Sequence, residues 1–184
     1  MRARPLLCHA DPMTILHTPR LTIRPLTLDD LPRVLAYRND PEVARYQGWP
    51  LPATPDSVAG LVSAAPLGAP GWVQRAVTLT GGELVGDVAL NTQGPQAELG
   101  VTLARRAQGH GYAREALHAL MTHAFTDLGL HRVHASIDPR NTAVAALLTR
   151  LGFRHEGTSL QSYLHRGEWT DDALYAVLAS EWTA

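Results

Sequence analysis

Cysteine is nearly absent from this chain, whose 184 residues include only Cys8. A single cysteine excludes an internal disulfide and a zinc site built from thiolates, and it favours a reducing compartment, for which the cytoplasm is the simplest expectation. Long hydrophobic runs are also missing, because no apolar stretch approaches the roughly 20 residues that span a bilayer. The formal net charge is only -1. The chain therefore has no general attraction for nucleic acid, and any anionic ligand must be bound by local donors.

The first dozen residues have a short apolar part that polar residues and a proline interrupt, which argues against a signal peptide. We expect a disordered lead over residues 1–12 and one domain over 13–184, a normal size for a single domain. The sequence leaves either Met1 or Met13 as the first residue of the native protein.

Hydrophobic periodicity predicts a mixture of strands and helices, without internal repeats. Alternating patterns predict strands over 20–26, 72–80, 83–91, 97–104 and 132–138, and two more within 153–182. Helical spacing, with a capping-box pattern at Thr27 and Asp30, predicts helices after residue 27, within 37–46, at 55–64, from 112 to 128 and over 141–153. The fold class is therefore mixed α/β, or α+β.

The segment LARRAQGHGYAREAL, residues 103–117, joins the end of a predicted strand to the most regular predicted helix. Such a turn aims unpaired backbone N–H groups and the positive end of the helix dipole at one spot, which favours an anion. Gly109 and Gly111 allow backbone conformations that other residues avoid and let a phosphate approach closely. A Walker loop is excluded because its lysine is missing. A dinucleotide-binding turn is excluded because Arg114 stands where a small residue is required.

The same turn matches the acyl-CoA loop of the GNAT acetyltransferases, Gln/Arg-x-x-Gly-x-Gly/Ala, as RAQGHG over 106–111. A second block, NTAVAALLTRLGF, is similar to the family's Asn-x-x-Ser helix that ends in Leu-Gly-Phe. The segments LTIRPLTLDDLPRVLAYRNDPEVARY and GEWTDDALYAVLASEW resemble the RimJ/RimL-type branch, the ribosomal-protein N-terminal acetyltransferases. The likeness covers the chain from about residue 14 to 182.

This resemblance implies a central, mostly antiparallel twisted sheet of about seven strands flanked by helices, with a splayed pair of strands that binds CoA. It implies transfer of an acetyl group from acetyl-CoA to a primary amine. Cys8 is badly placed for an acyl-cysteine intermediate, so we expect direct transfer in a ternary complex, and the spacing of the histidines gives no clear pair of metal ligands. Backbone N–H groups would hold the pyrophosphate and the thioester carbonyl. The residues implied for acetyl-CoA binding are Leu99, Gly100, Val101, Arg106, Gln108, Gly109, His110, Gly111, Tyr112, Ala113 and Asn141.

Glu98 is the candidate general base, since the amine is mostly protonated at neutral pH and RimJ/RimL-like sequences often have a glutamate here. The alternative is an exposed strand carboxylate without a role. The family's serine that protonates the departing thiolate is replaced by Val144. Either Tyr163, our candidate, or Tyr112 supplies this proton, or the thiolate leaves without an acid.

Three functions stay open. The first is acetylation of a protein N-terminus, the second is the same chemistry on a small amine, and the third is a non-catalytic acetyl-CoA sensor, which Val144 brings into consideration. Arg45, Tyr46 and Trp49 belong to the region that shapes the acceptor pocket in relatives, although they could equally be packing residues. The expected partners are an amine acceptor and a second copy of the chain, with no nucleic acid, membrane or metal.

Overall fold

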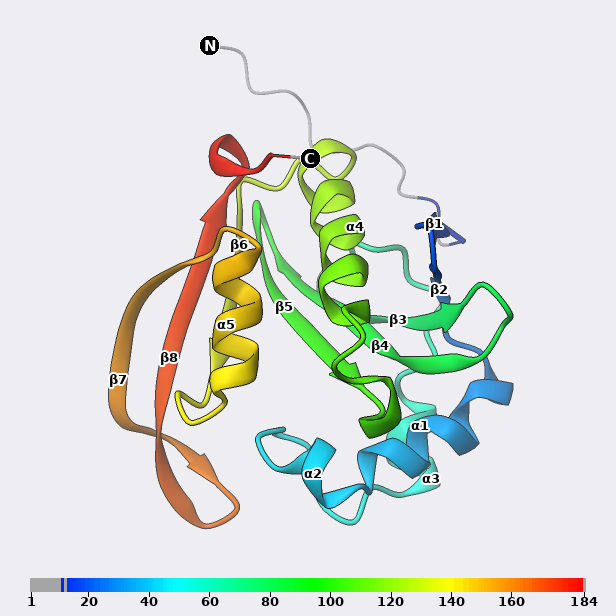
Figure 1. The fold of residues 1–184 in the computed structure, drawn as a ribbon, viewed down its shortest axis with the longest axis horizontal. Helices are drawn as coiled ribbons and strands as arrows, with labels where there is room; N and C mark the ends of the chain where they lie inside the picture. Colours follow the sequence, from blue (N-terminus) through cyan, green and yellow to red (C-terminus); the bar gives the residue numbers. More distant parts are fainter. Residues whose placement is uncertain (1–10, 12, 184) are drawn as a thin grey trace.

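The computed structural model describes residues 11 and 13–183. The lead expected over 1–12 therefore lies outside the described residues, apart from Asp11. Within the described part, one eight-stranded sheet forms the centre of the molecule, with strand order β1-β2-β3-β4-β5-β6-β8-β7 (Figure 1). The strands are β1 (Leu16–His17), β2 (Leu21–Pro25), β3 (Gly71–Leu79), β4 (Leu84–Gln93), β5 (Gln96–Leu103), β6 (Arg132–Ile137), β7 (Arg154–His165) and β8 (Glu168–Leu178).

The sheet has one strand more than the sequence predicts. The additional strand, β1, pairs only Leu16 with Ile23 and His17 with Thr22. Two residues are too few to show the alternation from which strands are inferred. The seven longer strands lie within a few residues of the predicted ranges, so the expectation of a mixed fold around a mostly antiparallel sheet is confirmed.

The helices also follow the predictions, except in length. The capping box at Thr27 and Asp30 is present and opens a short turn, Leu28–Asp30, before α1 (Leu31–Arg38). The predicted break near Asn39 separates α1 from α2 (Pro41–Ala44). The helix expected over 55–64 is shorter, because α3 (Pro55–Ala59) ends at Gly60.

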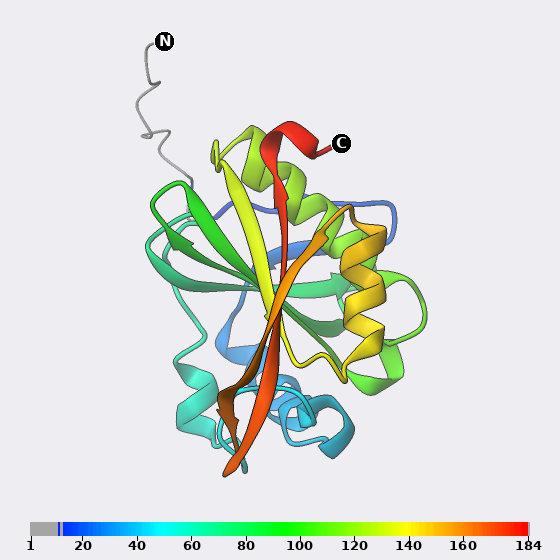
Figure 2. The ribbon, with the colours of Figure 1, turned by 90° about the vertical axis from the view of Figure 1, so that its left-hand side faces the viewer.

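The helices cover different parts of the sheet. The helix α4 (Tyr112–Thr126) buries one face in the main core, and α5 (Thr142–Arg150) adds Leu148 to it. The three short helices α1, α2 and α3 gather at one end of the molecule, the lower end in Figures 1 and 2. There they enclose a smaller apolar cluster around Val34 and Val58. None of the helices in the described ranges is long and apolar enough to cross a membrane.

Only one neighbouring pair of strands in the described sheet is parallel, namely β5 with β6. It has three register pairs, the last of which joins Glu98 to His134. Beyond the register pair of Glu98 and His134, β5 continues to Leu103 and β6 continues to Ile137, but the two strands no longer pair with each other. The two strands therefore diverge, which confirms the splayed pair that the family resemblance implies.

The hairpin of β7 and β8 extends past the splay towards the short helices (Figure 2). Its tip is attached to the segment after α2. The guanidinium of Arg166 donates to the carbonyl of Ala44 at 2.8 Å, and the ring nitrogen Nε2 of His165 lies 3.2 Å from the carbonyl oxygen of Arg45. These contacts join two parts of the chain that flank the opening between β5 and β6.

Candidate active site

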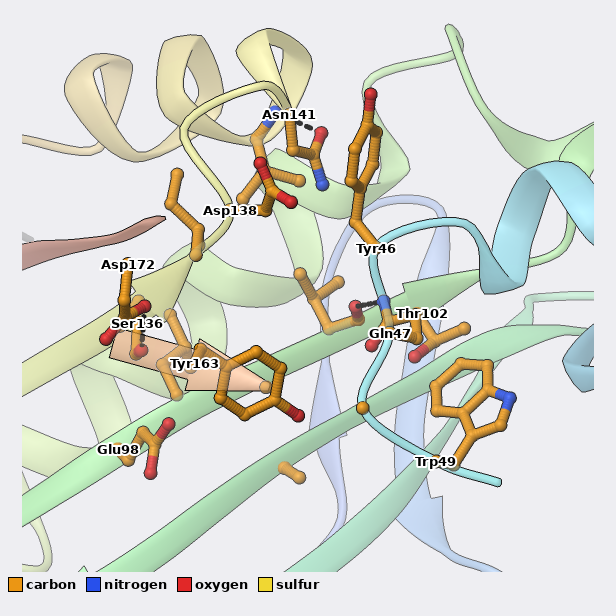
Figure 3. Close-up of a pocket in the computed structure, with 18 of the residues that line it drawn as sticks. Tyr46, Gln47, Trp49, Glu98, Thr102, Ser136, Asp138, Asn141, Tyr163 and Asp172 are labelled. Carbon is orange, nitrogen blue, oxygen red and sulfur yellow. Dashed lines mark hydrogen bonds between the residues drawn. The ribbon is translucent and has the colours of Figure 1, made fainter. Parts of the chain in front are cut away.

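A cavity of about 630 Å³ lies where β5 and β6 diverge. Strands β3, β4 and β5 form one wall, β6 and the β7–β8 hairpin form a second, and the segment 46–49 after α2 forms a third (Figure 3). Among the residues predicted for catalysis or donor binding, the cavity brings together Glu98, Leu99, Gly100, Val101, Asn141 and Tyr163. Arg106 and residues 108–113 do not line it, because they belong to the loop and helix beyond the end of β5.

Glu98 is half-buried and projects into the cavity from β5 (Figure 3). Within the described residues its carboxylate forms no hydrogen bond and no ion pair, so it is free to accept a proton or to bind an amine. Its partner in the register, His134, has a pKa that burial lowers, while the carboxylate of Glu98 opposes that shift. Glu98 and His134 thus form the last register pair before β5 and β6 separate.

The open edge of β5 supplies main-chain donors to the cavity. The carbonyl of Val101 accepts a hydrogen bond from the side-chain amide of Gln47 at 3.4 Å. In a strand the N–H and C=O of one residue point to the same edge, and successive residues alternate. The N–H of Val101 therefore faces the splay, whereas the N–H of Gly100 faces β4. Of the two, Val101 is better placed to bind an oxygen between the diverging strands.

The glycine-rich loop after β5 has the backbone conformation that its composition predicts. Gly109 and Gly111 have φ angles of +79° and +80°, values that favour glycine. Gly111 is the N-cap of α4 and provides no side-chain cap, so the N–H groups of Tyr112 and Ala113 have no capping partner. The loop is exposed from Gln108 to Gly111. These N–H groups can therefore bind a phosphate.

Two polar side chains of the loop are used within the protein. Arg106 forms an ion pair with Glu83 at 2.7 Å, and the side-chain amide of Gln108 donates to the carbonyl of Leu103 at 3.1 Å. Both contacts fix the course of the loop. The roles of these two residues in binding a donor stay predictions.

Arg20 contacts the glycine-rich loop, although nothing in the sequence indicated this role. Its side chain donates to the carboxylate of Glu115 at 2.6 Å and to the carbonyl of His110 at 3.0 Å, and its guanidinium lies 4.8 Å from the centre of the Tyr112 ring. Arg20 therefore attaches the loop to the beginning of β2. No local pattern predicts this, because Arg20 and His110 are separated by 90 positions.

Asn141 and Val144 lie at the beginning of α5, on the far side of the splay. The side-chain oxygen of Asn141 accepts from the N–H of Val144 at 3.3 Å and caps the helix, and both residues line the cavity. Figure 3 shows Asn141 next to Asp138 at the rim. The valine methyl groups face the cavity at the place where many family members have a hydroxyl.

Tyr163 is the only one of the two candidate acids that lines the cavity. It extends from the β7–β8 hairpin, and its hydroxyl packs against Gly48 so closely that a Cβ atom there would lie 2.5 Å from the oxygen. Tyr112 instead stacks on His110 beside the loop, with ring centres 5.6 Å apart. The geometry therefore favours Tyr163 over Tyr112.

Further polar residues of the cavity were not anticipated. Ser136 on β6 and Asp172 on β8 share a hydrogen bond at 2.5 Å (Figure 3). At the opposite end lie Arg38 and the fully buried Asp87 of β4, whose pKa burial raises. A charged residue inside an apolar strand, as in GDVALN, is the one sequence signal that could have revealed Asp87. The described residues contain no group of three or more potential ligands that could hold a metal ion.

Comparison with known proteins identifies the class. The model of the acetyltransferase (GNAT) domain matches residues 20–154. The N-acetyltransferase p20 of Bacillus licheniformis is 31% identical over 177 residues, which are 92% of this chain and 99% of the relative. The chain therefore belongs to the GNAT acetyltransferase family and is an acyltransferase.

Solved structures agree and include a member of the RimJ/RimL-like branch. A GNAT-family acetyltransferase from Bacillus anthracis has a TM-score of 0.82 and 29% identity, and the match covers 91% of this chain and 100% of that one. RimJ from Mycobacterium smegmatis, in complex with CoA-disulfide, has a TM-score of 0.78 and 26% identity, with coverage of 92% and 88%. These similarities support the branch that the terminal segments suggested.

Proposed function

We propose that the protein transfers the acetyl group of acetyl-CoA to a primary amine, which belongs to a protein N-terminus or to a small molecule. The observation that carries this proposal is the position of Glu98, an unpaired carboxylate at the last rung of a splayed strand pair. The glycine-rich loop follows on the same strand. The solved RimJ complex with CoA-disulfide supports a donor of the CoA type. The single cysteine is in keeping with a cytoplasmic enzyme.

The donor would lie along the open edge of β5. Its pyrophosphate would bind the uncapped N–H groups at the beginning of α4, where the helix dipole is favourable for an anion. Its thioester carbonyl would accept from the N–H of Val101, which is fixed before the reaction begins and therefore stabilises developing charge efficiently. Asn141 borders the same gap from the side of α5.

The transfer itself requires three proton movements. Glu98 accepts a proton from the amine, directly or through water, and the free amine attacks the thioester carbon. The C–N bond forms and the negative charge of the tetrahedral intermediate rests on the oxygen near Val101. The C–S bond then breaks, and Tyr163 gives its proton to the leaving thiolate. Because Val144 has no hydroxyl, Tyr163 is the residue we assign to this step. The Tyr163 phenolate regains a proton from the nitrogen of the new amide, which carries one proton too many after the attack.

The replacement of Glu98 by glutamine tests the proposal. We expect turnover to fall by about 10²- to 10⁴-fold, the usual contribution of a general base, while acetyl-CoA still raises the unfolding midpoint as it does in the wild-type protein. Turnover is measured by thiol release. Glu42→Gln, on the exposed surface of α2, is the matched control and should behave as the wild type.

Two outcomes would contradict this account. Full turnover in Glu98→Gln would show that another group takes the proton. A midpoint shift with acetyl-CoA but no acetylation of any amine by the wild-type protein would instead favour the sensor, the alternative to which Val144 points.

A further inference from the structure

The end of the cavity away from Glu98 contains a buried guanidinium. Arg38, the last residue of α1, is only 9% exposed and lines the cavity. Its guanidinium lies 4.3 Å from the ring centre of Trp49. Its Nε atom is buried and has no hydrogen-bond partner among the described residues. The cavity is therefore lined by a cation, one donor of which is enclosed by protein without such a partner.

The acidic neighbour of Arg38 compensates this charge only in part. Asp87 lies 3.8 Å away, which is beyond hydrogen-bond distance. One oxygen of its carboxylate already accepts from the hydroxyl of Tyr37 at 2.5 Å. Burial also raises the pKa of Asp87 and so disfavours its charged form. A ligand oxygen cannot reach the enclosed Nε atom and would instead meet the terminal nitrogens, one of which is only loosely paired with Asp87 at 3.8 Å. A hydrogen bond from this charged group to a ligand oxygen would be favourable.

We propose that Arg38 binds an oxygen of the acceptor, either a backbone carbonyl or a carboxylate, so that the acceptor is a peptide and not a polyamine. The proposal rests on the proposed function, because it places the amine of the acceptor beside Glu98. A polyamine would bring a second positive charge to the end of the cavity where Arg38 already stands, and the two charges would repel. A peptide instead brings carbonyl or carboxylate oxygen atoms to this end of the cavity.

The length of the cavity defines how far the oxygen lies from the amine. Thr102 stands opposite Asp87 in the register, four positions after Glu98 on β5, a distance of about 13 Å along an antiparallel strand. Gly100 and Ala89 form the floor between them, and the ring of Trp72 lies over Gly100, 3.2 Å from where a Cβ atom would be. An extended chain would therefore run beside this ring. Allowing for the reach of the glutamate and arginine side chains, two to three peptide residues of about 3.5 Å each bridge the gap.

Kinetics with a short acceptor series tests this assignment. The acceptors are alanine amide, tri-alanine and spermidine, and the variants are Arg38→Gln and Arg38→Lys. We expect the wild-type protein to prefer tri-alanine. Arg38→Gln should raise KM for tri-alanine by about 10- to 100-fold, the value of a hydrogen bond to a charged group. KM for alanine amide, which is too short to reach Arg38, should change less than about twofold. Arg38→Lys should fall between.

Arg33→Gln is the matched control, because Arg33 lies on the same helix, is exposed and does not line the cavity. It should leave all three acceptors unaffected. An equal loss with every acceptor in Arg38→Gln, or a wild-type preference for spermidine, would overturn the proposal.

The binding of tri-alanine, measured by calorimetry on the CoA-loaded protein, separates this proposal from the proposed function. Tight binding that depends on Arg38, without turnover of any amine, would contradict the acetyltransferase activity but retain the role of Arg38. Equal binding to the wild type and to Arg38→Gln, or no binding to either, would overturn the role of Arg38 even if amines are acetylated.

Discussion

Replacing Gly48 with alanine should displace the hydroxyl of Tyr163 without unfolding the protein. The added Cβ would lie 2.5 Å from the hydroxyl oxygen, whereas ordinary contact begins at 3.4 Å. The hydroxyl must therefore move by about 0.9 Å, and a misplacement of that size can lower turnover by about 100-fold when it affects a reacting group. Tyr163 is 47% exposed and its ring can turn, so the free energy of unfolding should change by less than about 1 kcal/mol.

A double variant shows whether the hydroxyl is responsible. In Gly48→Ala/Tyr163→Phe the Cβ meets no hydroxyl, and the nearest ring carbon is 3.8 Å away. If Tyr163 donates the proton, Tyr163→Phe lowers kcat by about 10²-fold or more. Adding Gly48→Ala should then lower it no further, because both changes act through one group.

The assay is thiol release at saturating acetyl-CoA, with the unfolding midpoint of each variant as a control for folding. Wild-type turnover in Tyr163→Phe would refute the assignment of Tyr163 as the acid. A double variant much slower than Tyr163→Phe would refute the inference that Gly48 acts through the hydroxyl.

Two further predictions concern stability. Gly86→Ala should lower the free energy of unfolding by about 3 kcal/mol or more, because the new Cβ would collide with the main-chain oxygen of Thr102, which cannot rotate away. In the control Gly81→Ala the new Cβ meets no atoms. Equal unfolding midpoints for the two variants would contradict this argument. Asp30→Asn should cost about 1 to 3 kcal/mol at neutral pH, because Arg24 donates to this carboxylate at 2.7 and 2.8 Å. The guanidinium of Arg24 lowers the pKa of Asp30, so its stabilising effect is present above about pH 4 and is lost as the pH falls through the lowered value. Denaturation at several pH values should show the wild type and the variant converging in acid, and a constant difference would count against the ion pair.

The sequence predicted those features that depend on neighbours along the chain. The capping box of Thr27 and Asp30 and the positive φ angles of Gly109 and Gly111 are local, because each is determined by a few adjacent residues. The long strands and α4 follow from periodic burial, which also requires only a local pattern. The splay between β5 and β6 was predicted only from the resemblance to the family, because hydrophobic periodicity does not indicate where two strands diverge.

The chemistry at the far end of the cavity could not be predicted in this way. Arg38 and Asp87 are distant in sequence and meet only because α1 packs at the end of the sheet. Alternation indicates which face of β4 carries Asp87, but it does not say which helix residue lies above it. The contact between Gly48 and Tyr163 has the same origin, since it depends on how the β7–β8 hairpin leans towards the segment after α2.

The three register pairs between β5 and β6 have a consequence for cooperativity. They are the only rungs that join the first five strands to β6, β8 and β7 in the described sheet. A donor that occupies the open edge of β5 would supply the rungs that β6 does not provide, and would act as a temporary strand. The two halves of the sheet should therefore open more independently in the empty protein than in the loaded one. Amide exchange in β6 and β8 would then depend on the concentration of a small molecule, and the protein would fold most completely when its substrate is present.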